Sequence, residues 1–152
     1  MESNFTRVYT FDVTPAAVFK AINDVRAWWS EDFAGSSTSV GDEFDVNFSD
    51  IHYSKQRITV MEQDRKIDWQ VVASKLTFLE NMSEWNGTTV SFNIDEADGK
   101  TRLTFIHHGL VPEAECYTNC SKGWTYYLEQ SLVPLIRTGA GAPNQLPVEA
   151  AK

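Results

Sequence analysis

The sequence predicts an α+β domain in which a curved antiparallel sheet of about six strands wraps around one long C-terminal helix. From residue 42 onward, apolar side chains recur at every second position, which is the period of strands with one buried face. Near the C-terminus the spacing of the apolar residues changes to three and four, which is the period of an amphipathic helix. Because this helix is the last element, we expect it to cover the apolar face of the sheet.

The N-terminal part is expected to form a strand and then short helical segments. Residues 5–12 alternate strand-forming and polar side chains. Thr14 is suited to cap a helix and Pro15 to begin it, since a proline in the first turn loses no hydrogen bond. Apolar residues continue at helical spacing as far as Val25. Residues 26–42 hold two adjacent tryptophans followed by small and polar residues, for which we expect a loop.

The central part is expected to form a run of antiparallel strands. Asp98 and Gly99 separate the last two of them, and an Asp-Gly pair between alternating segments indicates a tight hairpin. Residues 77–84 show no clear period, and both an edge strand and a loop remain open for them. The strands are expected at residues 42–49, 51–63, 66–76, 88–94 and 101–108.

Residues 112–139 are expected to form the long helix. Pro112 suits its first turn, and Gly139 can adopt the left-handed conformation that ends many helices. Gly123 and Pro134 interrupt the pattern, because glycine weakens a helix and proline bends it by removing a backbone donor. A bent helix with a small residue on its face can leave space beneath it. The apolar stripe that faces the sheet consists of Cys116, Cys120, Trp124, Leu128, Leu132 and Leu135.

Length and composition limit the possible architecture and partners. The 152 residues predict one domain, residues 1–139, followed by a mobile tail at residues 140–152, which lack periodicity. The net charge of −8 argues against nucleic acid and anionic membrane surfaces as partners. No apolar run is long enough to span a bilayer, so we expect no membrane insertion. We expect a cytoplasmic protein that is a monomer or a homodimer.

Two cysteines lie four residues apart in the expected helix. On one helix face their Cβ atoms would be about 6 Å apart, whereas a disulfide requires about 4 Å. We therefore expect Cys116 and Cys120 to be reduced. Together with His107 they could in principle bind zinc, but the usual ligand spacing is met only loosely and no second cysteine pair exists. We expect no metal and no cofactor.

Four segments, in their order and spacing, resemble a known family. They are TPAAVFKAI at residues 14–22, WNGTTVSF at 85–92, TRLTFIHHGL at 101–110 and GWTYYLEQSLVPLIRTGAG at 123–141. These segments are similar to the AHSA1-like branch (activator of Hsp90 ATPase homologue) of the START/Bet v 1 (SRPBCC) superfamily. The resemblance implies a helix-grip fold, with an apolar cavity between the sheet and the C-terminal helix. It also implies a broad functional range, from lipid and polyketide binding and cyclase-type catalysis to drug sequestration and Hsp90 stimulation, among which fold likeness does not choose.

Large apolar side chains are the candidate ligand-binding residues. Flat walls with a few polar groups bind hydrophobic or aromatic molecules, although the same side chains can simply fill the core. His107 lies on the inward side of its predicted strand, where it could donate a hydrogen bond to a ligand or act as an acid or base. The carboxylates Glu43, Asp45 and Asp68 fall on the solvent side and no nucleophile motif occurs, so no catalytic residue is assigned. The candidates are Trp28, Trp29, Phe33, Phe44, Phe48, Trp69, Phe92, Phe105, His107, Cys120, Trp124 and Leu128.

The leading hypothesis is a binding domain that holds a hydrophobic small molecule or a lipid between the helix and the sheet, without catalysis. The first alternative is a cochaperone-like interaction domain of the Hsp90-activator type, whose partner would be a chaperone. The second alternative is a polyketide cyclase-like or dehydratase-like enzyme that uses His107 with a carboxylate.

Overall fold

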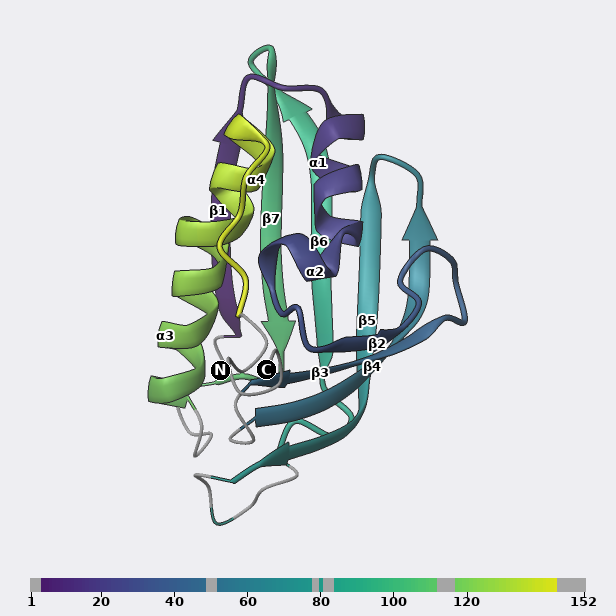
Figure 1. The fold of residues 1–152 in the computed structure, drawn as a ribbon. Helices are drawn as coiled ribbons and strands as arrows, with labels where there is room; N and C mark the ends of the chain where they lie inside the picture. The colour runs from purple at the N-terminus through teal and green to yellow at the C-terminus, as the bar shows by residue number, and fades with distance from the viewer. Residues whose placement is uncertain (1–3, 49–51, 78–79, 81–83, 112–116, 145–152) are drawn as a thin grey trace, which may run out of the picture.

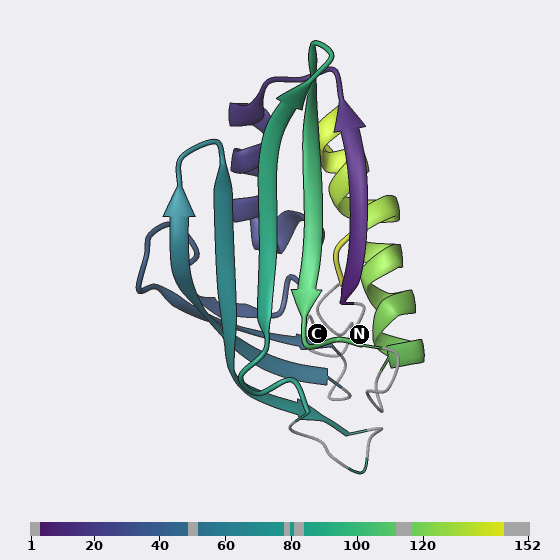
Figure 2. The ribbon, with the colours of Figure 1, turned by 180° about the vertical axis from the view of Figure 1, so that it is seen from behind.

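A single antiparallel sheet of seven strands forms one layer, and every described helix lies on the same face of it (Figures 1 and 2). The structure is a computed structural model that describes residues 4–48, 52–77, 80, 84–111 and 117–144. The strand order is β1-β7-β6-β5-β4-β3-β2, so the first two strands of the chain lie at opposite edges. The elements are β1 (Phe5–Phe11), α1 (Pro15–Asn23), α2 (Val25–Trp28), β2 (Phe33–Gly35), β3 (Glu43–Phe48), β4 (His52–Glu62), β5 (Lys66–Leu76), β6 (Thr89–Ala97), β7 (Lys100–His108), α3 (Tyr117–Tyr127), the π-helical turn η1 (Leu128–Leu132) and α4 (Val133–Thr138).

The predicted α+β helix-grip fold is confirmed, and several local signals act as the sequence predicts. The side chain of Thr14 accepts a hydrogen bond from the backbone N–H of Ala17 and so caps α1. Asp98 and Gly99 both have positive φ in the tight turn between β6 and β7. Gly139 ends α4 in the left-handed conformation, with φ of 89°. In each case the local geometry requires a particular residue type, which is why the sequence reveals it.

The loop predicted at residues 26–42 is wrong in part. The structure contains the short helix α2 at the start of this segment and the three-residue edge strand β2 within it. β2 pairs with β3 so closely that a Cβ on Gly35 would lie 2.3 Å from the carbonyl oxygen of Glu43. Small residues, which suggest a loop, are thus needed for close strand approach. β5 ends at Leu76, and the undecided segment at residues 77–84 is mostly outside the described residues.

The predicted C-terminal helix is continuous within the described residues but changes its winding. η1 separates α3 from α4, and the N–H of Val133 donates to the carbonyl oxygen of Leu128, five residues back. A π-turn accommodates Pro134, which has no N–H to offer to the preceding turn. It also keeps the buried face in register, because steps of four residues overshoot an α-helical turn of 3.6 residues. Ile136 is therefore buried in place of the expected Leu135, and the helix start at residues 112–116 is outside the described residues.

The first residues after α4 contact the body of the domain. The hydroxyl of Ser131 donates to the carbonyl oxygen of Trp28 at 2.6 Å and accepts the backbone N–H of Ala142 at 2.7 Å. Asn144 forms a parallel bridge with Ser30. Ser131 therefore joins α2, the C-terminal helix and the segment after it. The domain boundary at residue 139 and the mobility of the tail stay predictions.

All five tryptophans of the chain lie in one cluster between the helices and the sheet. Trp28 stacks on Trp29 and Trp69, and its indole N–H donates to the carbonyl oxygen of Ile22. Trp29 stacks on Trp124, which in turn stacks on Trp85. The cluster thus runs from the buried centre of the sheet to the C-terminal helix, where the packing opens.

Candidate functional site

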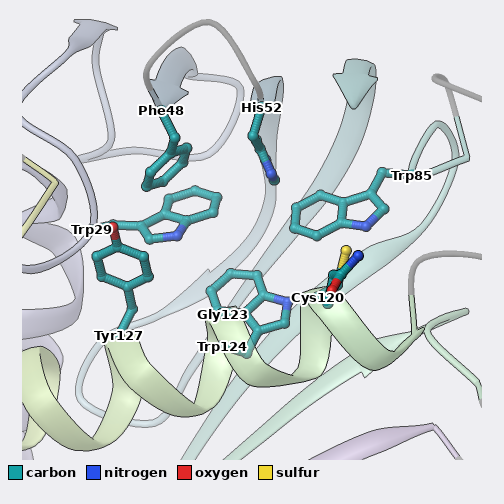
Figure 3. Close-up of a pocket in the computed structure, with 9 residues that line it drawn as sticks. Trp29, Phe48, His52, Trp85, Cys120, Gly123, Trp124 and Tyr127 are labelled. Carbon is teal, nitrogen blue, oxygen red and sulfur yellow. The ribbon is translucent and has the colours of Figure 1, made fainter. Parts of the chain in front are cut away.

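A cavity of about 300 Å³ lies between α3 and the ends of β3 and β4. We call it the aromatic cavity. Figure 3 shows Trp124 and Tyr127 rising from α3 toward Trp29, and His52 pointing toward the space between Trp29 and Trp85. Asn119 is exposed and marks its outer rim. The aromatic cavity is lined by Trp29, Phe48, His52, Trp85, Asn119, Cys120, Gly123, Trp124 and Tyr127.

Three of the indole rings that line the cavity are nearly parallel. The rings of Trp29 and Trp124 have centroids 5.0 Å apart and planes inclined by 17°. The rings of Trp124 and Trp85 have centroids 5.8 Å apart and planes inclined by 5°. Phe48 packs at an angle against Trp29 and against Tyr127. This arrangement offers flat apolar walls, which suit a flat apolar molecule.

His107 fixes two of these walls through a chain of hydrogen bonds. The indole N–H of Trp124 donates to Nδ1 of His107 at 3.0 Å, so the proton of a neutral ring is on Nε2. Nε2 lies 2.9 Å from the hydroxyl of Thr88, which is itself 2.7 Å from the carbonyl oxygen of Trp85. The ring therefore donates to Thr88, and Thr88 donates to Trp85. Both ring nitrogens of the fully buried His107 are thus engaged, and the ring positions Trp124.

His52 is the histidine that contacts the aromatic cavity. Its ring packs edge-on against Trp85 and Phe48, with centroid distances of 4.6 Å and 5.0 Å. Nε2 of His52 lies 3.3 Å from the buried hydroxyl of Ser54, which also accepts the side-chain N–H of buried Gln56. A short polar chain along β4 thus holds one polar ring in an otherwise aromatic wall.

The titratable side chains of the site are uncharged at neutral pH. Burial lowers the pKa of His52 to about 3. Burial, and to a smaller degree the neighbouring His108 and His52, lowers the pKa of His107 to about 3. Burial raises the pKa of the Tyr127 phenol, and Tyr126 adds to the effect. Each of these shifts follows from the cost of placing a charge in an apolar environment.

The structure brings four of the predicted site residues to the cavity and places the others elsewhere. Trp29, Phe48, Cys120 and Trp124 line it. The remaining candidates are not in its lining because they fill the core that supports it, except that Phe33 is only partly buried and stacks on Phe44. Ligand binding by any of the candidates stays a prediction. Those outside the lining are Trp28, Phe33, Phe44, Trp69, Phe92, Phe105, His107 and Leu128.

Five lining residues are not among the residues that the sequence predicts for the site. His52 begins a strand whose inward side is polar at Ser54 and Gln56, so hydrophobic alternation does not mark that side. Trp85 lies next to the segment without a clear period, and Tyr127 lies beside the apolar stripe rather than on it. Gly123 does carry a signal, since it interrupts a helix. A Cβ built on Gly123 would meet no heavy atom within 4 Å.

The expectation of reduced cysteines is wrong for Cys120, which is disulfide-bonded. The chain's other cysteine, Cys116, is outside the described residues. The expectation assumes that one helix spans both cysteines, whereas α3 as described begins at Tyr117. Over the part of the chain that the structure describes, no group of three or more His, Cys, Asp or Glu side chains is arranged to hold a metal ion.

The sequence profile of a known family matches residues 12–136, from just after β1 into α4. This family is described as activator of Hsp90 ATPase homolog 1-like protein. The chain belongs to this family. No curated protein matches the sequence.

Solved structures with the same fold cover nearly the whole chain. The solution structure of the Aha1 dimer from Colwellia psychrerythraea has a TM-score of 0.73 and 20% identity, and covers 91% of this chain and 99% of that chain. The crystal structure of Mll3558 from Rhizobium loti has a TM-score of 0.70 and 17% identity, and covers 90% of this chain and 97% of that chain. At these identities the similarity shows the fold alone. Among the described helices, none is both long and apolar enough to cross a membrane.

Proposed function

We propose that the protein binds a flat hydrophobic small molecule in the aromatic cavity. The observation that supports this most directly is the set of near-parallel indoles of Trp29, Trp85 and Trp124 around an unfilled volume of about 300 Å³. Ligand sites in proteins are concave and mostly apolar, with a few polar groups that orient the ligand. His52 supplies such a group here.

Gly123 gives the proposal a second line of support. Its place in the interior of α3 costs about 1 kcal/mol relative to alanine, because glycine is a poor helix former. No neighbouring atom excludes a Cβ there, so packing does not require glycine. The residue instead keeps the helix-side wall of the cavity open. A residue that lowers helix stability beside an unfilled volume is expected where a ligand occupies that volume, because local rules of stability are broken mainly at functional sites.

The proposal is tested by isothermal titration calorimetry with 1-naphthylmethanol, a small flat aromatic molecule. We expect saturable binding to the wild-type protein. Gly123→Leu places a side chain in the cavity and is expected to weaken binding at least about tenfold, which corresponds to about 1.4 kcal/mol. The control is Lys122→Leu, because Lys122 is exposed on the same helix outside the cavity lining. Absence of binding to the wild-type protein, or equal binding to both variants, contradicts the proposal.

Family membership favours a second candidate function, that of a cochaperone-like interaction domain acting on Hsp90. Its test is the Hsp90 ATPase rate with and without the protein. Stimulation that Gly123→Leu leaves intact would assign the function to an outer surface rather than to the cavity. The similar Aha1 protein from Colwellia psychrerythraea is a dimer in solution, so a homodimer is the assembly to test first by light scattering.

A further inference from the structure

The described residues that line the aromatic cavity carry no charge at neutral pH. The lining contains five aromatic side chains, one asparagine, one glycine, one disulfide-bonded cysteine and His52. His52 is neutral at neutral pH because burial disfavours its protonated form. Among the described residues that line the cavity there is thus neither a cation to pair with a carboxylate nor a carboxylate to pair with an ammonium ion.

All five described ion pairs join strand or turn residues, such as Glu43 with Arg57 and Asp95 with Arg102, and none includes a lining residue. The C-terminal helix also bonds to β1: Glu129 of η1 accepts a hydrogen bond from the hydroxyl of Tyr9, and the hydroxyl of Thr125 of α3 accepts one from the guanidinium of Arg7. A charged ligand would therefore lose its hydration in the cavity without a partner of opposite charge among the described lining residues.

We propose that the aromatic cavity selects uncharged aromatic molecules and excludes both carboxylates and ammonium ions of the same shape. This inference rests on the proposed function, and it adds the chemical class of the ligand. Removing a charge from water without a counter-charge costs far more than burying a neutral hydroxyl that keeps one hydrogen bond. For an anion, the net charge of −8 adds a repulsive field. For a cation, contact with an aromatic face contributes about 2 kcal/mol in a desolvated site, which is far less than the cost of removing an unpaired charge from water.

His52 determines which neutral group fits. It supplies the imidazole ring of the described lining, and its contact with the hydroxyl of Ser54 holds the orientation of that ring. A hydroxyl or carbonyl on the ligand can exchange a hydrogen bond with this ring or with the Asn119 amide at the rim. A charged substituent has only the same two neutral partners, His52 and Asn119. The selection therefore depends on the charge of the ligand and not on its size.

The test uses three molecules that share a naphthalene ring and a one-carbon substituent: 1-naphthylmethanol, 1-naphthoate and 1-naphthylmethylammonium. At neutral pH, calorimetric titration is expected to show binding of the alcohol and at least about tenfold weaker binding of both ions. Equal affinities for the alcohol and either ion overturn the charge selection while leaving the proposed function standing. Failure of all three to bind overturns both.

A charge placed at the rim gives a second, independent measurement. Asn119→Lys introduces a cation into the lining and is expected to raise the affinity for 1-naphthoate at least about fivefold. Thr118→Lys changes the net charge by the same amount on an adjacent exposed residue outside the lining, and is expected to leave that affinity within about twofold. Equal effects of the two variants, or no gain with Asn119→Lys, overturn the inference.

Discussion

Acidification should destabilise the protein because His107 is buried in its neutral form. The ring is fully buried, and its pKa is lowered from 6.5 to about 3. In the unfolded chain the same ring takes up a proton near pH 6.5. Between these values the unfolded state binds more protons than the native state, so stability falls as the pH falls. The contribution of the neutral His107 ring to stability is complete above pH 6.5 and is lost progressively as the pH falls to about 3.

The magnitude follows from the same shift. Each pH unit below the pKa of the unfolded chain lowers the free energy of unfolding by about 1.4 kcal/mol. His107 alone should therefore lower it by about 2 kcal/mol between neutral pH and about pH 5. His52 acts in the same direction, since burial lowers its pKa to about 3 as well. The assay is urea unfolding followed by tryptophan fluorescence at a series of pH values.

His107→Gln should reduce the pH dependence by about 1.4 kcal/mol per pH unit in this range. His108→Gln is the matched control, because His108 is adjacent but exposed. If His107→Gln does not fold, NMR of the wild-type His107 ring gives the same information, since the ring should remain neutral while the protein is native. An unchanged slope in His107→Gln, or protonation of the native ring near pH 6, would refute the reasoning.

Two further predictions concern the C-terminal helix and the segment after it. Ser131→Ala should lower the free energy of unfolding by about 2 to 3 kcal/mol, because the carbonyl of Trp28 and the N–H of Ala142 both lose their partner. The control is Ser121→Ala, which should lower it by less than about 0.5 kcal/mol because the Ser121 hydroxyl makes only a local contact with Thr118. Equal losses of stability in the two variants would contradict the structure. Gly123→Ala should stabilise the protein by about 1 kcal/mol, whereas Gly141→Ala should destabilise it by about 1 to 3 kcal/mol because its Cβ would lie 2.3 Å from the carbonyl oxygen of Ala27. Chemical denaturation measures both, and the same sign for the two glycines would refute the role given to Gly123 in the cavity wall.

The parts of the fold that the sequence could predict are those in which one residue type satisfies one local requirement. Thr14 at a helix start, Asp98 and Gly99 in a hairpin and Gly139 at a helix end are such cases. The apolar alternation of β3, β5, β6 and β7 predicts their buried faces for a similar reason, because one face must exclude water.

The cavity lining could be predicted only in part, because it depends on tertiary contacts. Trp124 is predictable because it lies on the apolar stripe of the helix. Trp85 and His52 are not, because Trp85 follows a sequence segment without a clear period and His52 begins a strand whose inward side is polar. β4 also contains irregularities that shift its register against β5. Whether an aromatic side chain packs into the core, as Trp69 does, or faces an open volume, as Trp29 does, depends on what the facing elements leave unfilled.

The most direct test of the central claim is an NMR measurement of intermolecular NOEs between 1-naphthylmethanol and the protein. Binding in the aromatic cavity predicts NOEs from the naphthalene protons to the indole protons of Trp29, Trp85 and Trp124, and their loss in Gly123→Leu. NOEs confined to other parts of the surface, or a bound ring with none to these three indoles, would contradict the claim that the aromatic cavity is a ligand site.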